Sequence, residues 1–295
     1  MLTTPPAPVD LSTVHPRLAA LARTTVRLHP RAGSPSADQS SLGGPLVWPA
    51  DEPWPTCDGP AGGDHLDGEP GEEVVPLAPV LQLLASDVPE LPFPPGTDVL
   101  QVLWCPFDHE PDSAPRPELR WRRLADIGPA LAEMPAPDEE TDPQLVPSPC
   151  VLHPERVVEY PADEVLGPLA EVIARIEQDT GWAYESELAT ATGTKALGHP
   201  DWIQSPDWPV CGCGAEMEHL LTVASWEFSR GDEKRWIATE DRPAMDGWGF
   251  DADDDHPWFA LRNPAGLMLG DVGNVYLFVC TRCPERPSAH RFDCS

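Results

Sequence analysis

The sequence lacks any long apolar run and is poor in basic residues. No stretch approaches the ~18 consecutive apolar residues that a membrane-spanning helix needs. Lys and Arg number 19 against 49 Asp and Glu, which gives a formal net charge of -30. Nucleic acids and anionic membranes require clustered Lys and Arg, so we expect neither as a partner. A solvated acidic surface is the simpler interpretation of this charge, and a basic protein partner, such as a nuclease-type toxin, is the alternative.

The recognisable signatures of enzymes are also missing. We find no nucleophile elbow, phosphate-binding loop, His-Glu-x-x-His motif or dinucleotide-binding glycines. His153, His199, His219 and Asp271 are candidates for a pocket between two halves, but their spacing does not bring them together. The start of the chain has no basic region followed by an apolar segment, so we expect no signal peptide and a cytoplasmic protein. We expect a non-enzymatic binding protein, with an enzyme or small-molecule-binding protein using an inter-half cleft as the alternative.

Cysteines carry the clearest chemical signal in the chain. Eight cysteines without a secretory signal favour thiols or metal ligands over disulfides. Cys211 and Cys213 form a Cys-x-Cys pair, while Cys280 and Cys283 form a Cys-x-x-Cys pair after the apolar run 275–279. If that run is a strand, both pairs meet at its end, and four thiolates suit a closed, structural zinc site. Buried cysteines at strand ends and a redox dithiol are the alternatives.

The first half of the sequence repeats features of the second half. The matching pairs are residues 42–45 with 197–200, Trp48 with Trp202, Cys57 with Cys211, 81–83 with 221–223 and 98–105 with 273–280. The first match has an offset of 155 and the next two have 154, which implies a slip of one residue. Ordered agreement of Trp and Cys positions indicates an internal duplication.

The pattern of apolar residues predicts an α+β protein. Strands are expected at residues 24–28, 77–84, 99–105, 118–124, 157–160, 219–224, 258–261 and 275–279, and a helix at 163–178. We expect two related halves, each a mainly antiparallel sheet with one or two helices, packed into one body. The proposed divisions are an N-terminal segment with a short helix (1–23), a first repeat (24–134), an acidic proline-bearing linker (135–150) and a second repeat with the cysteine cluster (151–295).

Short motifs in the second half resemble a known family. They are a Leu-Gly-x-Pro turn at residues 197–200, a strand at 220–223, a Gly-Asp-x-Gly turn at 270–273 and a Tyr-x-Phe strand at 276–278. Over roughly residues 24–290 the chain resembles the YwqG-like bacterial family, which has no known function. His199 replaces the usual second Gly, and Thr222 replaces the usual Gln. The resemblance implies an α+β fold and a cytoplasmic protein, and it implies no catalytic residues.

Two further cysteines occupy matching places in the first half. Cys57 and Cys105 correspond to Cys211 and Cys280, but only His65 and His109 lie nearby in sequence as additional ligands. A tetrahedral site needs four ligands, so we interpret this one as eroded. His290 and Cys294 are possible substitutes in the four-cysteine site, and we expect neither to be used.

Tryptophan and acidic residues form the remaining conspicuous patterns. Trp48, Trp54, Trp202 and Trp208 lie in paired Pro/Trp segments. We interpret these rings as plugs at the ends of the sheets, with a recognition platform as the alternative, because exposed Trp anchors interfaces. The acidic residues 251–255 have oxygen ligands for a hard cation, but a solvated loop is the simpler interpretation.

Overall fold

A computed structural model of the chain describes residues 2–57, 75–109, 113–136, 141–229, 231–245 and 257–295. Most strands belong to two six-stranded antiparallel sheets. The first sheet has the order β2 (Arg31–Ala32), β9 (Cys150–Val151), β3 (Ser41–Leu42), β6 (Ala78–Leu84), β7 (Val99–Trp104) and β8 (Pro117–Arg122). The second has the order β10 (Glu155–Glu159), β1 (Arg23–Arg27), β11 (Lys195–Leu197), β12 (Glu218–Ala224), β13 (Asn274–Val279) and β14 (Ser288–Asp293). The short strands β4 (Thr56–Cys57) and β5 (Val75–Pro76) pair separately.

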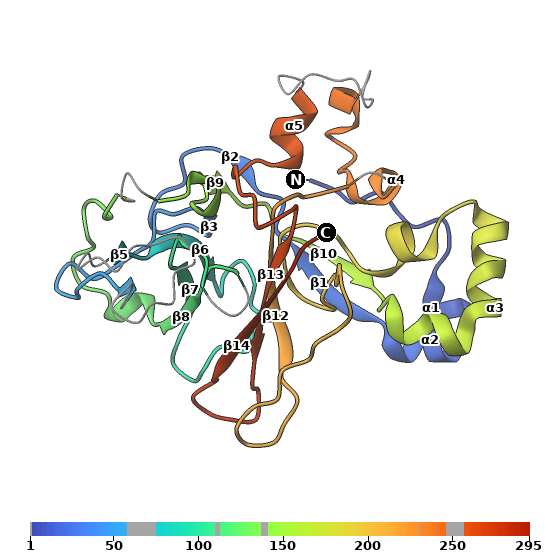
Figure 1. Ribbon diagram of the computed structural model, residues 1–295, viewed down its shortest axis with the longest axis horizontal. Helices are drawn as coiled ribbons and strands as arrows, with labels where there is room; N and C mark the ends of the chain where they lie inside the picture. Colours follow the sequence, from blue (N-terminus) through green and yellow to red (C-terminus); the bar gives the residue numbers. More distant parts are fainter. Residues whose placement is uncertain (1, 58–74, 110–112, 137–140, 230, 246–256) are drawn as a thin grey trace.

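Helices are few and lie outside the sheets. They are α1 (Leu11–Val14), α2 (Pro16–Leu21), α3 (Asp163–Thr180), α4 (Glu233–Trp236) and α5 (Pro257–Arg262), with short 3-10 turns at Leu124–Asp126, Pro143–Leu145 and Arg242–Met245 and a π-helical turn at Tyr184–Ala189. Figure 1 shows the two sheets side by side, with α1, α2 and α3 gathered at the far side of the second sheet. Leu169, Ile173 and Ile176 of α3 are buried against Leu11 and Leu18. None of the helices among the described residues combines the length and apolarity needed to cross a membrane.

The two sheets have the same strand register, which confirms the two related halves. β6 pairs with β7 as β12 pairs with β13, beginning at Ala78 opposite Trp104 and at Glu218 opposite Val279. Both ladders shift register one residue later, by a bulge at the second residue pair of β6 and of β12. A bulge is a specific local feature, so its recurrence at the same rung indicates duplication rather than chance.

The turn after β3 and β11 corrects the predicted alignment. Leu42 lies opposite Leu81, and Ala196 lies opposite Leu221, so the offset is 154 here as well. Each strand is followed by two residues of positive φ, Gly43 and Gly44 in one half and Leu197 and Gly198 in the other. The inferred slip was therefore wrong. The slip came from aligning the residue letters Leu-Gly-x-Pro rather than the two backbone positions of positive φ. Leu197 adopts one of these positions although it carries a side chain.

The halves exchange strands near their junction. β1 lies in the second sheet between β10 and β11, whereas β9 lies in the first sheet between β2 and β3. Three residues join β1 to β2 and another three join β9 to β10, so each short connection passes from one sheet to the other. Val26 and Leu28 pack in one apolar core with Val80, Leu100 and Leu221, which joins both sheets. The fold is therefore one packed body, as expected.

Two local predictions differ from the structure. Residues 258–261, predicted as a strand, form most of α5, because a four-residue apolar run has no decisive period. β14 was not predicted, since its centre carries His290 and Arg291 at the sheet edge. Strand β13, by contrast, is buried throughout, as its apolar sequence predicts.

A buried ion pair links the strands of the second sheet. Lys195 Nζ lies 2.9 Å from Glu159 Oε2, and both side chains have no exposed surface. The same carboxylate accepts hydrogen bonds from the backbone N–H groups of Ala191 and His199. Removing one partner from such a pair leaves an uncompensated charge in a medium of low dielectric constant.

We expect Lys195→Met to lower the free energy of unfolding by about 3–5 kcal/mol, because Glu159 then stays buried without its cation. Urea unfolding of the purified variant measures the loss. The double variant Lys195→Met/Glu159→Gln should recover most of it, since no charge is left buried. Equal stability of the single variant and the parent would contradict this account.

Candidate metal centre

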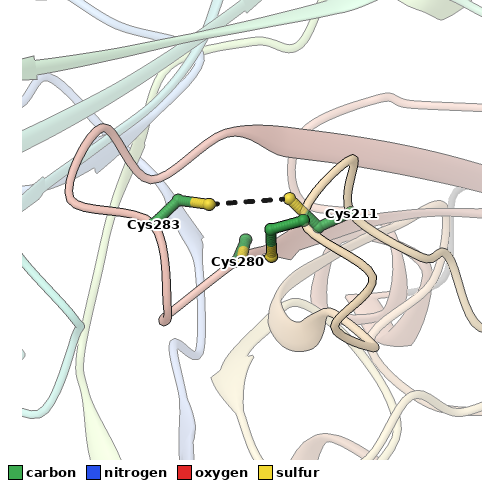
Figure 2. A group of neighbouring side chains, drawn as sticks. Cys211, Cys280 and Cys283 are labelled. Carbon is green, nitrogen blue, oxygen red and sulfur yellow. Dashed lines mark hydrogen bonds between the residues drawn. The ribbon is translucent and has the colours of Figure 1, made fainter.

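The four predicted cysteine ligands converge at one end of the second sheet. The sulfurs of Cys211, Cys213, Cys280 and Cys283 all lie within 4.8 Å of one another. The Cys211–Cys283 sulfur distance is 3.9 Å, and the Cys213–Cys280 distance is 3.7 Å. Tetrahedral thiolates at a bond length of about 2.3 Å place their sulfurs roughly 3.8 Å apart. This group can therefore hold a metal ion, and Figure 2 shows Cys211 and Cys283 directed toward each other from two loops.

Each cysteine pair is shaped by a tight hairpin. Cys211 donates a backbone hydrogen bond to Ala215, and Gly214 donates one back to Cys211. Gly214 has φ +82°, a conformation that glycine adopts without steric penalty. In the other hairpin, the N–H of Cys280 bonds to Pro287, and the N–H of Arg286 bonds to Cys283. The hairpins thus fix the backbone around the thiols without help from the thiols themselves.

The strand register brings the hairpins together. Glu218, at the start of β12, lies opposite Val279, at the end of β13. The first hairpin comes just before β12 and the second just after β13, so the antiparallel pairing places both at the same sheet end. None of the eight cysteines forms a disulfide.

Hydrogen bonds within the group separate the acidities of the thiols. The backbone N–H of Cys283 holds the pKa of the Cys280 thiol down to about 7. A side-chain hydrogen bond with Cys213 raises the pKa of Cys283 to about 12. One thiolate therefore forms readily near neutral pH, and the other thiols lose their protons when a cation binds.

An aromatic cluster connects the cysteine group to a small pocket. Trp202 packs against Phe278 at 5.8 Å between ring centroids and against Trp208 at 6.1 Å. Both tryptophans line a hollow of about 80 Å³, together with Glu185, His199 and Asp201. Burial raises the pKa of Asp201 to about 7, although Lys195 acts in the opposite direction. The pocket carboxyl therefore titrates near neutrality. It was not predicted, because a single Asp carries no motif.

The other candidate residues have mixed outcomes. His199 and His219 are buried and bonded to backbone oxygens of Leu21 and Leu197, while His153 and Asp271 are exposed. Of these four, His199 lines the pocket. His65 and residues 251–256 lie outside the described residues. Among the tryptophans, Trp48 is fully buried and the other three are partly buried, which agrees with the plug interpretation.

We expect Cys280→Ser to abolish metal binding by this group and to lower stability. A ligand that binds the folded state alone adds about 4 kcal/mol at a thousand-fold excess over its Kd, and this contribution is lost with the site. Elemental analysis and urea unfolding, each with and without a chelator, measure both effects. Cys294→Ser is the matched control, because Cys294 lies outside the group. A parent protein whose stability does not respond to chelation would argue against the site.

We expect Asp201→Asn to flatten part of the pH dependence of stability. The pKa of Asp201 is raised from 3.8 to about 7, so between these values the folded protein holds a proton that the unfolded chain has lost. Stability from this group is therefore complete below the lower value and decreases as pH rises through the higher one. Between these two pH values, the free energy of unfolding of the parent should fall, relative to that of the variant, by up to about 1.4 kcal/mol per pH unit.

Urea unfolding of both proteins at several pH values across this window tests the effect. The difference between them cancels contributions that they share, including metal binding. A difference that is constant with pH would show that Asp201 titrates normally.

Comparison with known proteins gives the centre no assignment. No family model matches the chain, and no curated protein matches it. The centre is therefore interpreted from its own ligands and contacts.

Proposed function

We propose that the chain is a non-enzymatic binding protein, stabilised by zinc, whose partner is a basic protein. The observation that carries this proposal is the exposure of Val210, which is 66% exposed and directly precedes the metal ligand Cys211. It is the most exposed large hydrophobic side chain among the described residues. Ile203, which begins the same loop, is also exposed, and exposed apolar side chains grouped on one surface are what an interface uses.

Zinc is the ion that the ligand set favours. Four thiolates are soft ligands, and a tetrahedral set of protein sulfurs is typical of structural zinc sites. All four positions are filled by Cys211, Cys213, Cys280 and Cys283, so such an ion has no position left for a substrate. The role supported by this geometry is to hold two hairpins together.

The loop of residues 203–210 is the surface that we propose for binding. Ile203 is 41% exposed at its start, Val210 lies at its end, and the partly buried Trp208 lies between them. Asp293 accepts the backbone N–H groups of Ile203 and Gln204 at 2.9 and 3.1 Å. The loop is thus fixed at both ends before any partner binds, which reduces the entropy lost on association.

Charge supports a basic partner. The net charge of -30 favours fast, salt-dependent association with a cationic protein. Asp207 lies on the exposed loop, and Glu216 and Glu218 are exposed in and beside the metal hairpin. One form of the proposal is a toxin-neutralising role, in which the partner is a basic nuclease. This form rests on charge and on the YwqG-like resemblance, which we propose as the family and which implies a cytoplasmic protein.

The alternative function is a small-molecule site or an enzyme, and the observation that favours it is the pocket with Asp201. Its volume of about 80 Å³ is well below the ~300–1,000 Å³ typical of ligand pockets. Its described lining comes from residues 161–208 of the second half, not from both halves. The exposed loop therefore supports binding of a protein better than the pocket supports binding of a metabolite.

We expect a photo-crosslinking amino acid at Val210 to capture a basic protein in cells that produce the chain. The same amino acid at Val158, 52% exposed on the edge strand β10, is the matched control. The captured protein is then purified and its affinity measured directly. Val210→Asp should weaken binding at least about tenfold, as expected for a hot-spot contact, and raised salt should weaken it further.

Two outcomes would contradict the proposal. One is an identical set of adducts from both positions. The other is a metabolite that co-purifies in the pocket and is lost in a Trp202→Ala variant, while no basic protein is captured. Elemental analysis of the same preparation tests zinc, since a different bound metal would contradict that part alone.

A further inference from the structure

A second group of metal-binding side chains lies in the first half. Ligand atoms of Cys57, Cys105 and His109 all lie within 4.8 Å of one another. Cys57 Sγ is 3.8 Å from His109 Nε2. Cys105 and His109 are 1% and 4% exposed, so the group lies beneath the surface. The sequence predicted an eroded site here, because only His65 and His109 lie near the two cysteines as further ligands.

Backbone contacts make these residues equivalent to the four-cysteine group. Cys57 lies opposite Val75 in a hairpin, as Cys211 lies opposite Ala215. The N–H of Leu77 donates to the carbonyl oxygen of Pro55, which lies two residues before Cys57. Likewise, the N–H of Met217 donates to the carbonyl oxygen of Pro209, which lies two residues before Cys211. The two cysteines therefore occupy equivalent positions in the strand pairing of the two halves.

The second thiol and the histidine follow the same rule. Cys105 comes directly after β7 and donates its N–H to Arg116, as Cys280 comes after β13 and donates to Pro287. His109 follows Cys105 by four residues, where Cys283 follows Cys280 by three. The histidine thus takes the place of the last thiol, and its spacing from the preceding cysteine is one residue longer.

We propose that Cys57, Cys105 and His109 bind a second metal ion. Two thiolates and one imidazole are a ligand set that suits zinc. Zinc bonds of about 2.3 Å to sulfur and about 2.0 Å to nitrogen separate these atoms by roughly 3.5 Å, close to the distance found.

The two groups would therefore differ in chemistry although they share a backbone frame. The second-half group offers four thiolates, whereas the described ligands of the first-half group are two thiolates and one imidazole. The ligand that fits the first-half group is a divalent cation that accepts both sulfur and nitrogen donors. This inference is independent of the proposed protein partner, because it concerns the opposite sheet.

Cobalt titration of the full chain, prepared without metal under reducing conditions, tests the proposal. We expect two equivalents of cobalt to bind, each with a sulfur-to-cobalt charge-transfer band, and the band should be weaker for the site with two thiolates. Cys57→Ser should remove one equivalent and Cys280→Ser the other, while Cys294→Ser keeps both.

Cysteine alkylation of the unmodified chain provides a measurement that needs no variant. With zinc present, Cys57 should be protected from alkylation, and Cys294 should react as it does without zinc. Saturation at one equivalent would overturn the proposal. So would unchanged alkylation of Cys57, or two equivalents bound by a Cys57→Ser variant.

Discussion

The pairing of Glu218 with Val279 is the contact on which the second half depends. It aligns the start of β12 with the end of β13, and thereby places two cysteine hairpins against each other. From Cys213 to Cys280 the sequence separation is 67 (280 minus 213), so the chain must close a long loop before the thiols can meet. The buried ladder offsets the entropy of that closure, which grows only slowly with loop length. A metal ion bound by the four thiols would fix the end of the ladder.

The four-cysteine group could be predicted because its ligands form two short cysteine pairs in the sequence. Two cysteine pairs, one directly after an apolar strand, restrict the geometry strongly once the strand is assumed. The first-half group could not be predicted with the same force. Its cysteines are single, and His109, one of two histidines nearby in sequence, is placed beside Cys57 only by the folded chain. Asp201 gave no signal for a related reason, since its raised pKa comes from burial, which sequence does not display.

The fold could be predicted in its layers but not in its connections. Apolar strands such as β7 and β13 are buried on both faces, and their composition indicates this directly. The exchange of β1 and β9 between sheets depends on long-range pairing, which no local pattern encodes. The repeated sequence pattern divides the chain near residue 150. However, β1, which precedes that division, belongs to the second sheet, and β9, which lies at the division, belongs to the first. Backbone conformation aligned the repeats more accurately than residue identity, as the positive φ of Leu197 shows.

Equivalent positions in the two halves have diverged toward different tasks. Arg122 ends β8 where Asp293 ends β14, opposite Val99 and Asn274 respectively. In the first half, Arg122 forms an ion pair with Glu52, and its Cζ lies 4.2 Å from the centroid of the Trp48 ring. The Arg122 side chain therefore covers Trp48. In the second half, Asp293 instead accepts backbone N–H groups of the loop of residues 203–210 from within the protein.

Arg291 forms an ion pair with Asp207 of that loop, but Val210 at the end of the loop remains exposed. Val210 takes the position of Thr56 in the first half, and its apolar surface faces water beside the four-cysteine group. Duplication thus supplied one rigid frame twice. One copy covers Trp48 with Arg122, whereas the other exposes Val210 beside the four-cysteine group.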